Sequence, residues 1–206
     1  MAVSPTTNTA LSNYRGTGTM PRSAPLTPLG ISALSLLVEE PMHPYEMYQL
    51  LMARHEDRLV KVRPGTLYHA VGRLEERGLV ETAGTDREGN RPERTTYRIT
   101  PAGREALTAR LQDMLAEPVN EYPSFPLAVA EAYNLPAALV VELLGRRLAL
   151  LQEQLEFLQR GEAAVLKKDV ARKYWIDLEY QQTMLRSEMG WIRSLQDQLR
   201  SGELPW

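Results

Sequence analysis

The stretch Arg63-Pro-Gly-Thr-Leu-Tyr-His-Ala-Val-Gly-Arg-Leu-Glu-Glu-Arg-Gly-Leu-Val-Glu81 predicts a short helix, a turn at Gly78 and a strand. Apolar residues at helical spacing define one buried face, formed by Leu67, Ala70, Val71 and Leu74. The other face carries a hydroxyl, a phenol, an imidazole and a guanidinium group, from Thr66, Tyr68, His69 and Arg73. Such an outward face suits the major groove of DNA. Ordinary amphipathic surface helices share this pattern. The neighbouring segments must therefore show whether this helix reads DNA or only covers a core.

Two helices are expected before this stretch, and each begins with a proline. Thr27-Pro28 combines a capping hydroxyl with proline at the first helical position, and Pro41 ends that helix. His43-Pro44 repeats the proline start for a second helix, which extends to about residue 54. Residues 58–63 form the next turn, in which three side chains are expected to pack inward: Leu59, Val60 and Val62.

A β-hairpin is expected after the stretch. Residues 79–82 form one short strand, and residues 94–99 alternate and are rich in β-branched side chains, which is typical of a second strand. The tip between them carries two basic side chains, Arg87 and Arg91. Thr100-Pro101 begins a fourth helix, to about residue 115. This order predicts a winged helix-turn-helix domain: mostly α, with a small two-stranded β wing.

The positive charge of the chain is local. The net charge is −2, which by itself does not favour nucleic-acid binding. Residues 58–77, however, hold five basic and two acidic residues, a local charge of +3. Acidic residues elsewhere in the chain hide this basic region in the total.

Several classes of protein are disfavoured by what the sequence lacks. It has no cysteine, hence no disulfide, no thiolate zinc site and no thiol nucleophile, which fits a reducing cytoplasm. It has no apolar run of about 18 residues and no secretory signal pattern, so we expect no membrane span and a cytoplasmic location. His43 and Glu46 have a spacing seen in metal sites but no further ligands. Since no catalytic or cofactor motif is present, we expect no enzyme, cofactor or metal.

The composition divides the chain into four parts. Residues 1–25 are rich in Ser, Thr, Pro, Gly and Asn and are expected to form a disordered arm. Residues 26–116 form the winged helix-turn-helix domain. Residues 117–126 contain three prolines and are expected to be a linker without one regular element. Residues 127–200 form a helical domain, with a short helix at 127–133, a long one to about 159 and a last one at about 169–199.

The last predicted helix carries a seven-residue apolar repeat. Its members are Leu178, Leu185, Ile192 and Leu199, with Met189 and Leu195 beside them. Such a seam requires a helical partner. The partner can be a second copy of the chain or a helix of the same chain, and the repeat does not distinguish the two.

Four motifs resemble the PadR family of bacterial transcriptional regulators. They are Thr27-Pro-Leu-Gly-Ile-Ser-Ala-Leu, Pro44-Tyr-Glu-Met, residues 65–80 of the opening stretch, and Arg94-Thr-Thr-Tyr-Arg-Ile-Thr-Pro-Ala-Gly-Arg. The resemblance covers residues 26–110. From Phe125 to Leu199 the chain is similar, by pattern more than by motif, to the helical C-terminal domain of the longer PadR subgroup. Glu93 departs from the basic residues usual at that point of the family's wing.

The resemblance implies a homodimer on a pseudo-palindromic operator, usually a repressor, that a small effector releases. It also implies that the last helices form most of the dimer interface, which here assigns dimerisation to Leu178, Leu185, Ile192, Leu195 and Leu199. The effector is expected to be a small aromatic molecule. The residues we assign to its site are Tyr174, Trp175 and Trp191.

Within the DNA-binding hypothesis the candidate side chains divide by role. Base edges are assigned to Thr66, Tyr68, His69 and Arg73. The Gly65 amide or Thr66, at the start of the helix, can bind a phosphate. Other phosphate contacts are assigned to Lys61, Arg63, Arg87 and Arg91.

Two alternatives stay open on the sequence. Glu75, Glu76, Glu88 and Glu93 near the presumed DNA face keep a winged-helix interaction adaptor without DNA binding in consideration. A DNA-binding regulator without a small-molecule effector is the other alternative. Binding to a specific duplex separates the first alternative from the main hypothesis.

Overall fold

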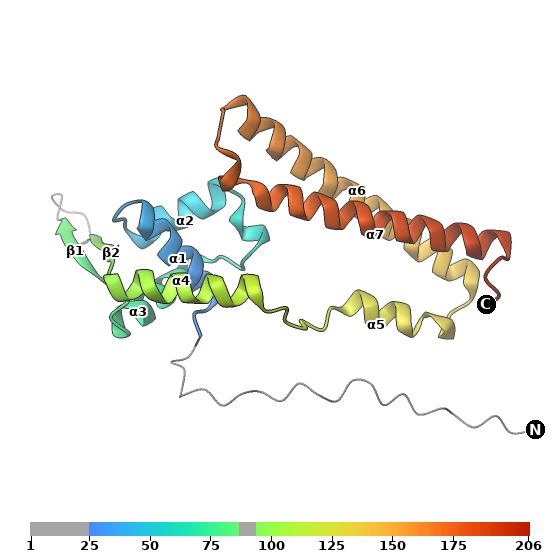
Figure 1. Cartoon of the computed structure of the whole chain (residues 1–206), viewed down its shortest axis with the longest axis horizontal. Helices are drawn as coiled ribbons and strands as arrows, with labels where there is room; N and C mark the ends of the chain where they lie inside the picture. The colour runs from blue at the N-terminus through green and yellow to red at the C-terminus, as the bar shows by residue number, and fades with distance from the viewer. Residues whose placement is uncertain (1–24, 87–93) are drawn as a thin grey trace, which may run out of the picture. The chain divides into compact units, whose positions relative to one another are not determined.

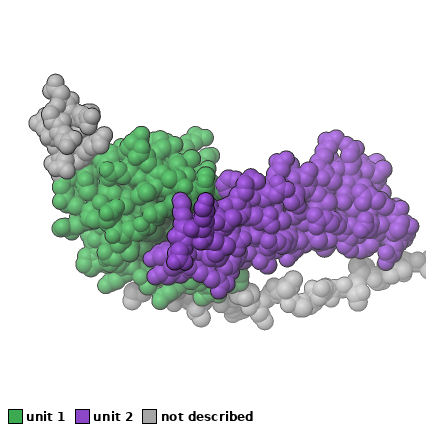
Figure 2. All heavy atoms as spheres, turned by 90° about the horizontal axis from the view of Figure 1, so that it is seen from above, with its two compact units in different colours: residues 1–119 green, residues 120–206 purple. Residues whose placement is uncertain are grey.

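The computed structural model describes residues 25–86 and 94–206 (Figure 1). The chain divides into two compact units, residues 1–119 and residues 120–206, which Figure 2 shows in two colours. The division falls inside the predicted linker of residues 117–126. The predicted disordered arm, apart from Pro25, and the hairpin-tip residues Arg87 and Arg91 lie outside the described residues.

The described residues of unit 1 form four α-helices, each with proline as its first residue. They are α1 (Pro28–Glu39), α2 (Pro44–Ala53), α3 (Pro64–Glu76) and α4 (Pro101–Ala116). Thr27 and Thr100 cap α1 and α4 by accepting backbone N–H bonds of 3.1 and 3.0 Å, and His43 caps α2 through Nδ1 at 3.1 Å. The capping side chains satisfy N–H groups that lack an intrahelical partner, and proline at the first position loses none.

The hairpin pairs β1 (Val80–Asp86) with β2 (Arg94–Ile99) in antiparallel register, from Val80 opposite Ile99 to Asp86 opposite Arg94. Met42, between α1 and α2, adds a short bridge to Tyr97 through two backbone hydrogen bonds of 3.1 Å. The predicted fold class, mostly α with a two-stranded wing, is confirmed. β1 is longer than the strand predicted at residues 79–82.

The core of unit 1 collects the buried sides of its helices and of the hairpin. Leu67, Ala70, Val71 and Leu74 of α3 are at most 3% exposed, as the helical spacing predicts. They pack with side chains from α1, α2 and the strands, including Leu34, Leu37, Met47, Leu51 and Val80. The opposite side of α3 therefore faces solvent.

The turn between α2 and α3 differs from the prediction. It contains a short 3-10 helix, η1 (Glu56–Arg58), and His55 before it adopts a left-handed conformation with φ of 57°. Val60 and Val62 pack against the core, but Leu59 is 60% exposed. The prediction that Leu59 packs inward is wrong, because the 3-10 turn places consecutive apolar side chains on different sides of the segment.

Every secondary-structure element of unit 2 is a helix. It contains α5 (Ser124–Ala130), η2 (Ala132–Asn134), α6 (Ala137–Lys167), η3 (Arg172–Tyr174) and α7 (Ile176–Ser201). α5 begins inside the predicted linker, three residues earlier than expected. Pro126 is its third residue, and the first turn tolerates proline because its N–H groups have no intrahelical acceptor.

The ends of the long helices also differ from the prediction. α6 continues eight residues past residue 159, and α7 begins at Ile176 rather than near Asp169. Asp169 has a φ of 52°, a left-handed conformation that ends the regular structure after α6. The reversal from α6 to α7 therefore takes place over residues 168–175.

The seven-residue seam of α7 packs against α6 of the same chain. Met189 and Ile192 are buried at 2% and 0% exposure, and Leu185, Leu195 and Leu199 pack on the same cluster. The α6 side of that cluster is Val140, Leu144, Leu148, Leu151 and Leu155. The helical partner that the repeat requires is thus present within one chain.

Polar side chains link the two helices of this hairpin. Gln196 donates to the carbonyl oxygen of Val141 at 2.7 Å, and Gln182 donates to Glu162 Oε2 at 2.8 Å. Both glutamines are nearly buried, at 4% and 2% exposure. Since a buried polar group is costly without a partner, these bonds favour one register of α6 against α7.

Candidate nucleic-acid interface

The start of α3 is held by its own hydrogen bonds. The Thr66 hydroxyl donates to the carbonyl oxygen of Arg63 at 2.8 Å and accepts from the Arg63 backbone N–H at 3.2 Å. The predicted base-reading role of Thr66 stays a prediction, but its hydroxyl hydrogen is engaged within the chain.

The surface side of α3 carries three lines of side chains, since each residue turns a helix by about 100°. The middle line, opposite Leu67 and Leu74, consists of Gly65, His69, Gly72 and Glu76. One lateral line consists of Thr66 and Arg73, and the other of Tyr68 and Glu75. The two lateral lines border different parts of unit 1.

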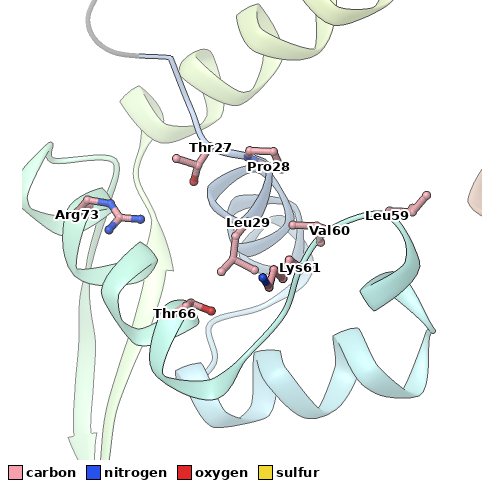
Figure 3. Close-up of a pocket in the computed structure, with 8 residues that line it drawn as sticks. All are labelled: Thr27, Pro28, Leu29, Leu59, Val60, Lys61, Thr66 and Arg73. Carbon is pink, nitrogen blue, oxygen red and sulfur yellow. The ribbon is translucent and has the colours of Figure 1, made fainter. Parts of the chain in front are cut away.

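The Thr66–Arg73 line borders an open cavity of about 320 Å³, which we name the α1–α3 cavity. Its lining comes from the start of α1, the turn before α3 and α3 itself: Thr27, Pro28, Leu29, Leu59, Val60, Lys61, Thr66 and Arg73. Figure 3 shows the Arg73 guanidinium turned toward Thr27, with Lys61 on the other side of Leu29. The lining holds two basic residues and no acidic residue.

The Tyr68 side chain lies on the opposite lateral line and is 46% exposed. Its ring meets the ring of His43 edge to face, with 5.8 Å between centroids and 74° between planes. The contact joins α3 to the residue that caps α2 and limits the directions that the phenol can take. Tyr68 therefore presents a positioned aromatic group on the surface of α3.

Glu75, on the same line as Tyr68, contacts the wing. Its carboxylate accepts from the Thr82 hydroxyl at 3.2 Å and from the Tyr97 hydroxyl at 3.4 Å. Burial, followed by the negative charge of Glu75, raises the pKa of Tyr97. Glu75 is thus turned toward the two strands, which removes one acidic group from those that the adaptor alternative relies on.

The structure places every described DNA-contact candidate in unit 1. Lys61, Arg63, Gly65, Thr66, Tyr68, His69 and Arg73 are all exposed. Lys61, Thr66 and Arg73 come together at the α1–α3 cavity. The sequence argument missed the start of α1 as part of this surface, because no local pattern reports that residues 27–29 pack beside α3.

The three effector candidates do not share one location within the chain. Trp175 is 8% exposed and its indole N–H donates to the Val170 carbonyl at 2.9 Å, whereas Tyr174 beside it is 71% exposed. Trp191 follows the first residue of α7 by fifteen residues, roughly 22 Å along the helix axis. It meets the Phe125 ring edge to face at 6.3 Å. Trp175 therefore serves the packing of the α6–α7 reversal.

Two further searches of the described residues bear on function. No helix in the described ranges is long and apolar enough to span a membrane. Nor do three or more His, Asp or Glu side chains gather into a metal-binding cluster anywhere in residues 25–86 or 94–206.

Comparison with known proteins adds a family and a shared fold. Residues 33–109 match the model of the Transcriptional regulator PadR-like family. Bacillus subtilis PadR in complex with operator DNA is 18% identical with a TM-score of 0.69, over 85% of this chain and 99% of that chain. The structure of Bacillus subtilis PadR in complex with p-coumaric acid is 13% identical with a TM-score of 0.67, over 84% and 98%.

The Vibrio cholerae virulence activator AphA is 17% identical with a TM-score of 0.64, over 84% of this chain and 98% of that chain. No match was found among curated proteins. At these identities the solved structures show a common fold that includes the helical C-terminal region. In residues 33–109, which span most of the winged helix-turn-helix domain, the chain is therefore similar to the PadR-like family of transcriptional regulators, and it shares the fold of the solved structures.

Proposed function

We propose that this regulator acts as a homodimeric repressor, inserting α3 of each copy into the major groove of a pseudo-palindromic operator. The observation that carries the proposal is the exposed side of α3, which presents Tyr68, His69 and Arg73 to solvent while its other side is fixed in the core. A helix held in this way can enter the groove without rearranging.

The surrounding groups support contact with the DNA backbone. Lys61 and Arg63 come directly before α3 and are exposed, and they suit phosphates on either side of the groove. Arg87 and Arg91 are assigned to phosphate contacts from the hairpin tip on the sequence alone. His69, on the middle line of α3 between Gly65 and Gly72, is the residue that we assign to a base edge.

For the dimer we propose the face of α7 turned away from the α6 cluster. Ile176, Tyr180, Met184 and Trp191 lie within one narrow stripe of α7 and are 47–66% exposed. The predicted seam residues pack against α6, and Ile192 has no exposed surface to offer a second copy. A direct dimerisation role for Leu178, Leu185, Leu195 and Leu199 stays a prediction.

The dimer proposal is tested by Tyr180→Asp, which places a charge in the middle of the stripe. Sedimentation equilibrium should show a weaker dimer, and operator binding should become more dependent on protein concentration. Glu179→Gln is not a suitable control, because Glu179 is paired with Arg172. Arg160→Ala, an exposed change on α6, is the better one. A dimer of unchanged stability in Tyr180→Asp would exclude this face.

We further propose that a small aromatic molecule releases the protein from DNA. The support is the relative whose structure holds p-coumaric acid and the exposed rings of unit 2, including Tyr174 and Trp191. Titration of aromatic acids, read by tryptophan fluorescence and by loss of the DNA complex, tests it. A change in fluorescence without loss of the DNA complex would contradict release.

The central experiment is a gel-shift titration of the full chain on its own upstream region at several salt concentrations. We expect a specific complex whose affinity falls steeply with salt. His69→Ala should reduce the preference for the operator over random DNA, with Glu153→Ala on α6 as the matched surface control. Absence of any duplex binding, together with partner binding that depends on the α3 surface, would favour the adaptor.

A further inference from the structure

We propose that the α1–α3 cavity holds one phosphate of the DNA backbone, gripped by Lys61 and Arg73 together. This inference rests on the proposed DNA-binding function and deepens it. It also changes the role of Arg73, which the sequence assigns to a base edge. The group recognised is a phosphodiester, and its source is the operator strand beside α3.

The first argument is the charge of the cavity. Lys61 comes from the turn before α3 and Arg73 from the last turn of α3, so two separate elements bring cations to one cavity. No acidic side chain lines it, and the first turn of α1 contains none. Both side chains bring positive charge to the same cavity, and an anion bound there is attracted by both.

The second argument is that both cations are available. No hydrogen bond or ion pair joins the side chain of Lys61 or Arg73 to any other residue of the described ranges, and both residues are exposed. Arg54 and Arg98 of the same unit, by contrast, are engaged by Glu39 and Glu81. Lys61 and Arg73 can therefore bind an external anion without first breaking a contact.

The third argument is the shape and the walls of the cavity. A volume of about 320 Å³ exceeds that of a phosphate group, since a water molecule in the liquid takes up about 30 Å³. Pro28, Leu29 and Val60 form apolar walls. The positive charges of the lining thus come from Lys61 and Arg73, at a cavity that is open to a strand of DNA.

The fourth argument is the direction of the Arg73 side chain. Arg73 lies on the lateral line of α3 with Thr66, not on the middle line with His69. Its guanidinium is turned toward Thr27, at the start of α1 (Figure 3). A group on the side of a recognition helix that is turned back toward the protein meets the sugar–phosphate edge of the groove rather than its floor.

The test combines variants of the protein with a chemical change of the DNA. Arg73→Ala and Lys61→Ala should each weaken binding about tenfold, on the operator and on random duplex alike. The preference for each operator base should not change. The Lys61→Ala/Arg73→Ala protein should lose about 0.9 from the slope of log affinity against log salt concentration, the value for one phosphate, rather than about 1.8 for two. Arg160→Ala, which removes one charge from α6 in the other unit, is the control.

The DNA arm replaces single backbone phosphates by neutral methylphosphonates along the strand. One position should weaken binding of the unaltered protein about as much as the Lys61→Ala/Arg73→Ala double change does, and should have no further effect on the doubly changed protein. Additive losses at every position would overturn the shared site. Relaxed selectivity at one base pair in Arg73→Ala would return Arg73 to the base edge and overturn the inference, while the proposed function stands.

Two other outcomes are also decisive. If exchange of chloride for inorganic phosphate at equal ionic strength weakens DNA binding only when Arg73 is present, and the methylphosphonate scan is flat, the cavity binds free phosphate. The assignment to DNA is then wrong. If the unaltered protein binds no duplex at any salt concentration, the proposed function and this inference both fail.

Discussion

A Cβ atom placed on Gly103 would lie 2.0 Å from the backbone carbonyl oxygen of Leu79. Gly103 is the third residue of α4, and Leu79 directly precedes β1. The same oxygen accepts a hydrogen bond from the Thr100 backbone N–H at 3.1 Å. The start of the wing and the start of α4 are therefore in direct contact, with no room for a methyl group between them.

Gly103→Ala should destabilise unit 1 strongly. The clash is with backbone, which cannot move away as a flexible side chain can, so we expect a loss of about 3 kcal/mol in the free energy of unfolding. Urea denaturation followed by circular dichroism measures it. An unfolding free energy within experimental error of the unaltered protein would show that the contact is looser than described.

Gly72→Ala should have the opposite effect on stability. Apart from its chain neighbours and the nearby backbone of its own helix, no atom lies within 4 Å of a Cβ at Gly72, which is in the interior of α3. Alanine there should therefore stabilise the helix by about 0.5–1 kcal/mol. Because Gly72 lies on the middle line of α3, the added methyl group should also weaken operator binding in the same gel-shift assay. If the protein became more stable while its operator affinity stayed unchanged, the middle line of α3 would lie outside the DNA interface.

The ion pair of Glu39 with Arg54 should make stability depend on pH. Two hydrogen bonds of 2.6 and 2.8 Å join their side chains, and the bond from Arg54 lowers the pKa of Glu39 below its ordinary value of 4.5. A carboxyl whose pKa is lower in the folded state stabilises the protein above its unfolded pKa, and the effect is lost as the pH falls through the folded pKa.

Glu39→Gln should accordingly cost up to about 1 kcal/mol at neutral pH, discounted because both side chains are more than 40% exposed. The difference between the two proteins should shrink below about pH 4.5. Midpoints of urea denaturation, measured for both proteins at several pH values, test this pH dependence. A difference that stays constant down to pH 3 would exclude the ion pair as its cause.

Ile192→Ala should open a cavity in the α6–α7 hairpin. Ile192 has 0% exposure and lies in the cluster with Leu144 and Leu151, so truncation should cost about 2–5 kcal/mol. Leu150→Ala is the matched control, because Leu150 is 59% exposed on the same hairpin and its truncation should cost less than about 1 kcal/mol. Thermal unfolding of both proteins compares them, and equal losses would contradict the packing described.

Local signals predicted the beginnings of the helices in unit 1. Thr27, His43 and Thr100 each cap a helix whose first residue is the following proline, and both effects act over three residues or fewer. The spacing of Leu67 and Leu74 predicted which side of α3 is buried, because a helix has a fixed period. The winged helix-turn-helix and its exposed α3 surface follow from these two kinds of pattern.

Long-range packing decided the rest. A seven-residue repeat shows that Leu185 and Ile192 require a helical partner, but only the folded chain shows that α6 supplies it, because periodicity carries no information on which helix lies opposite. Likewise, Trp175 is one of several aromatic residues in the sequence, and its burial depends on where the α6–α7 reversal brings Val170. The α1–α3 cavity joins residues more than 40 positions apart, and such a distance is determined only when the helices pack around a common core.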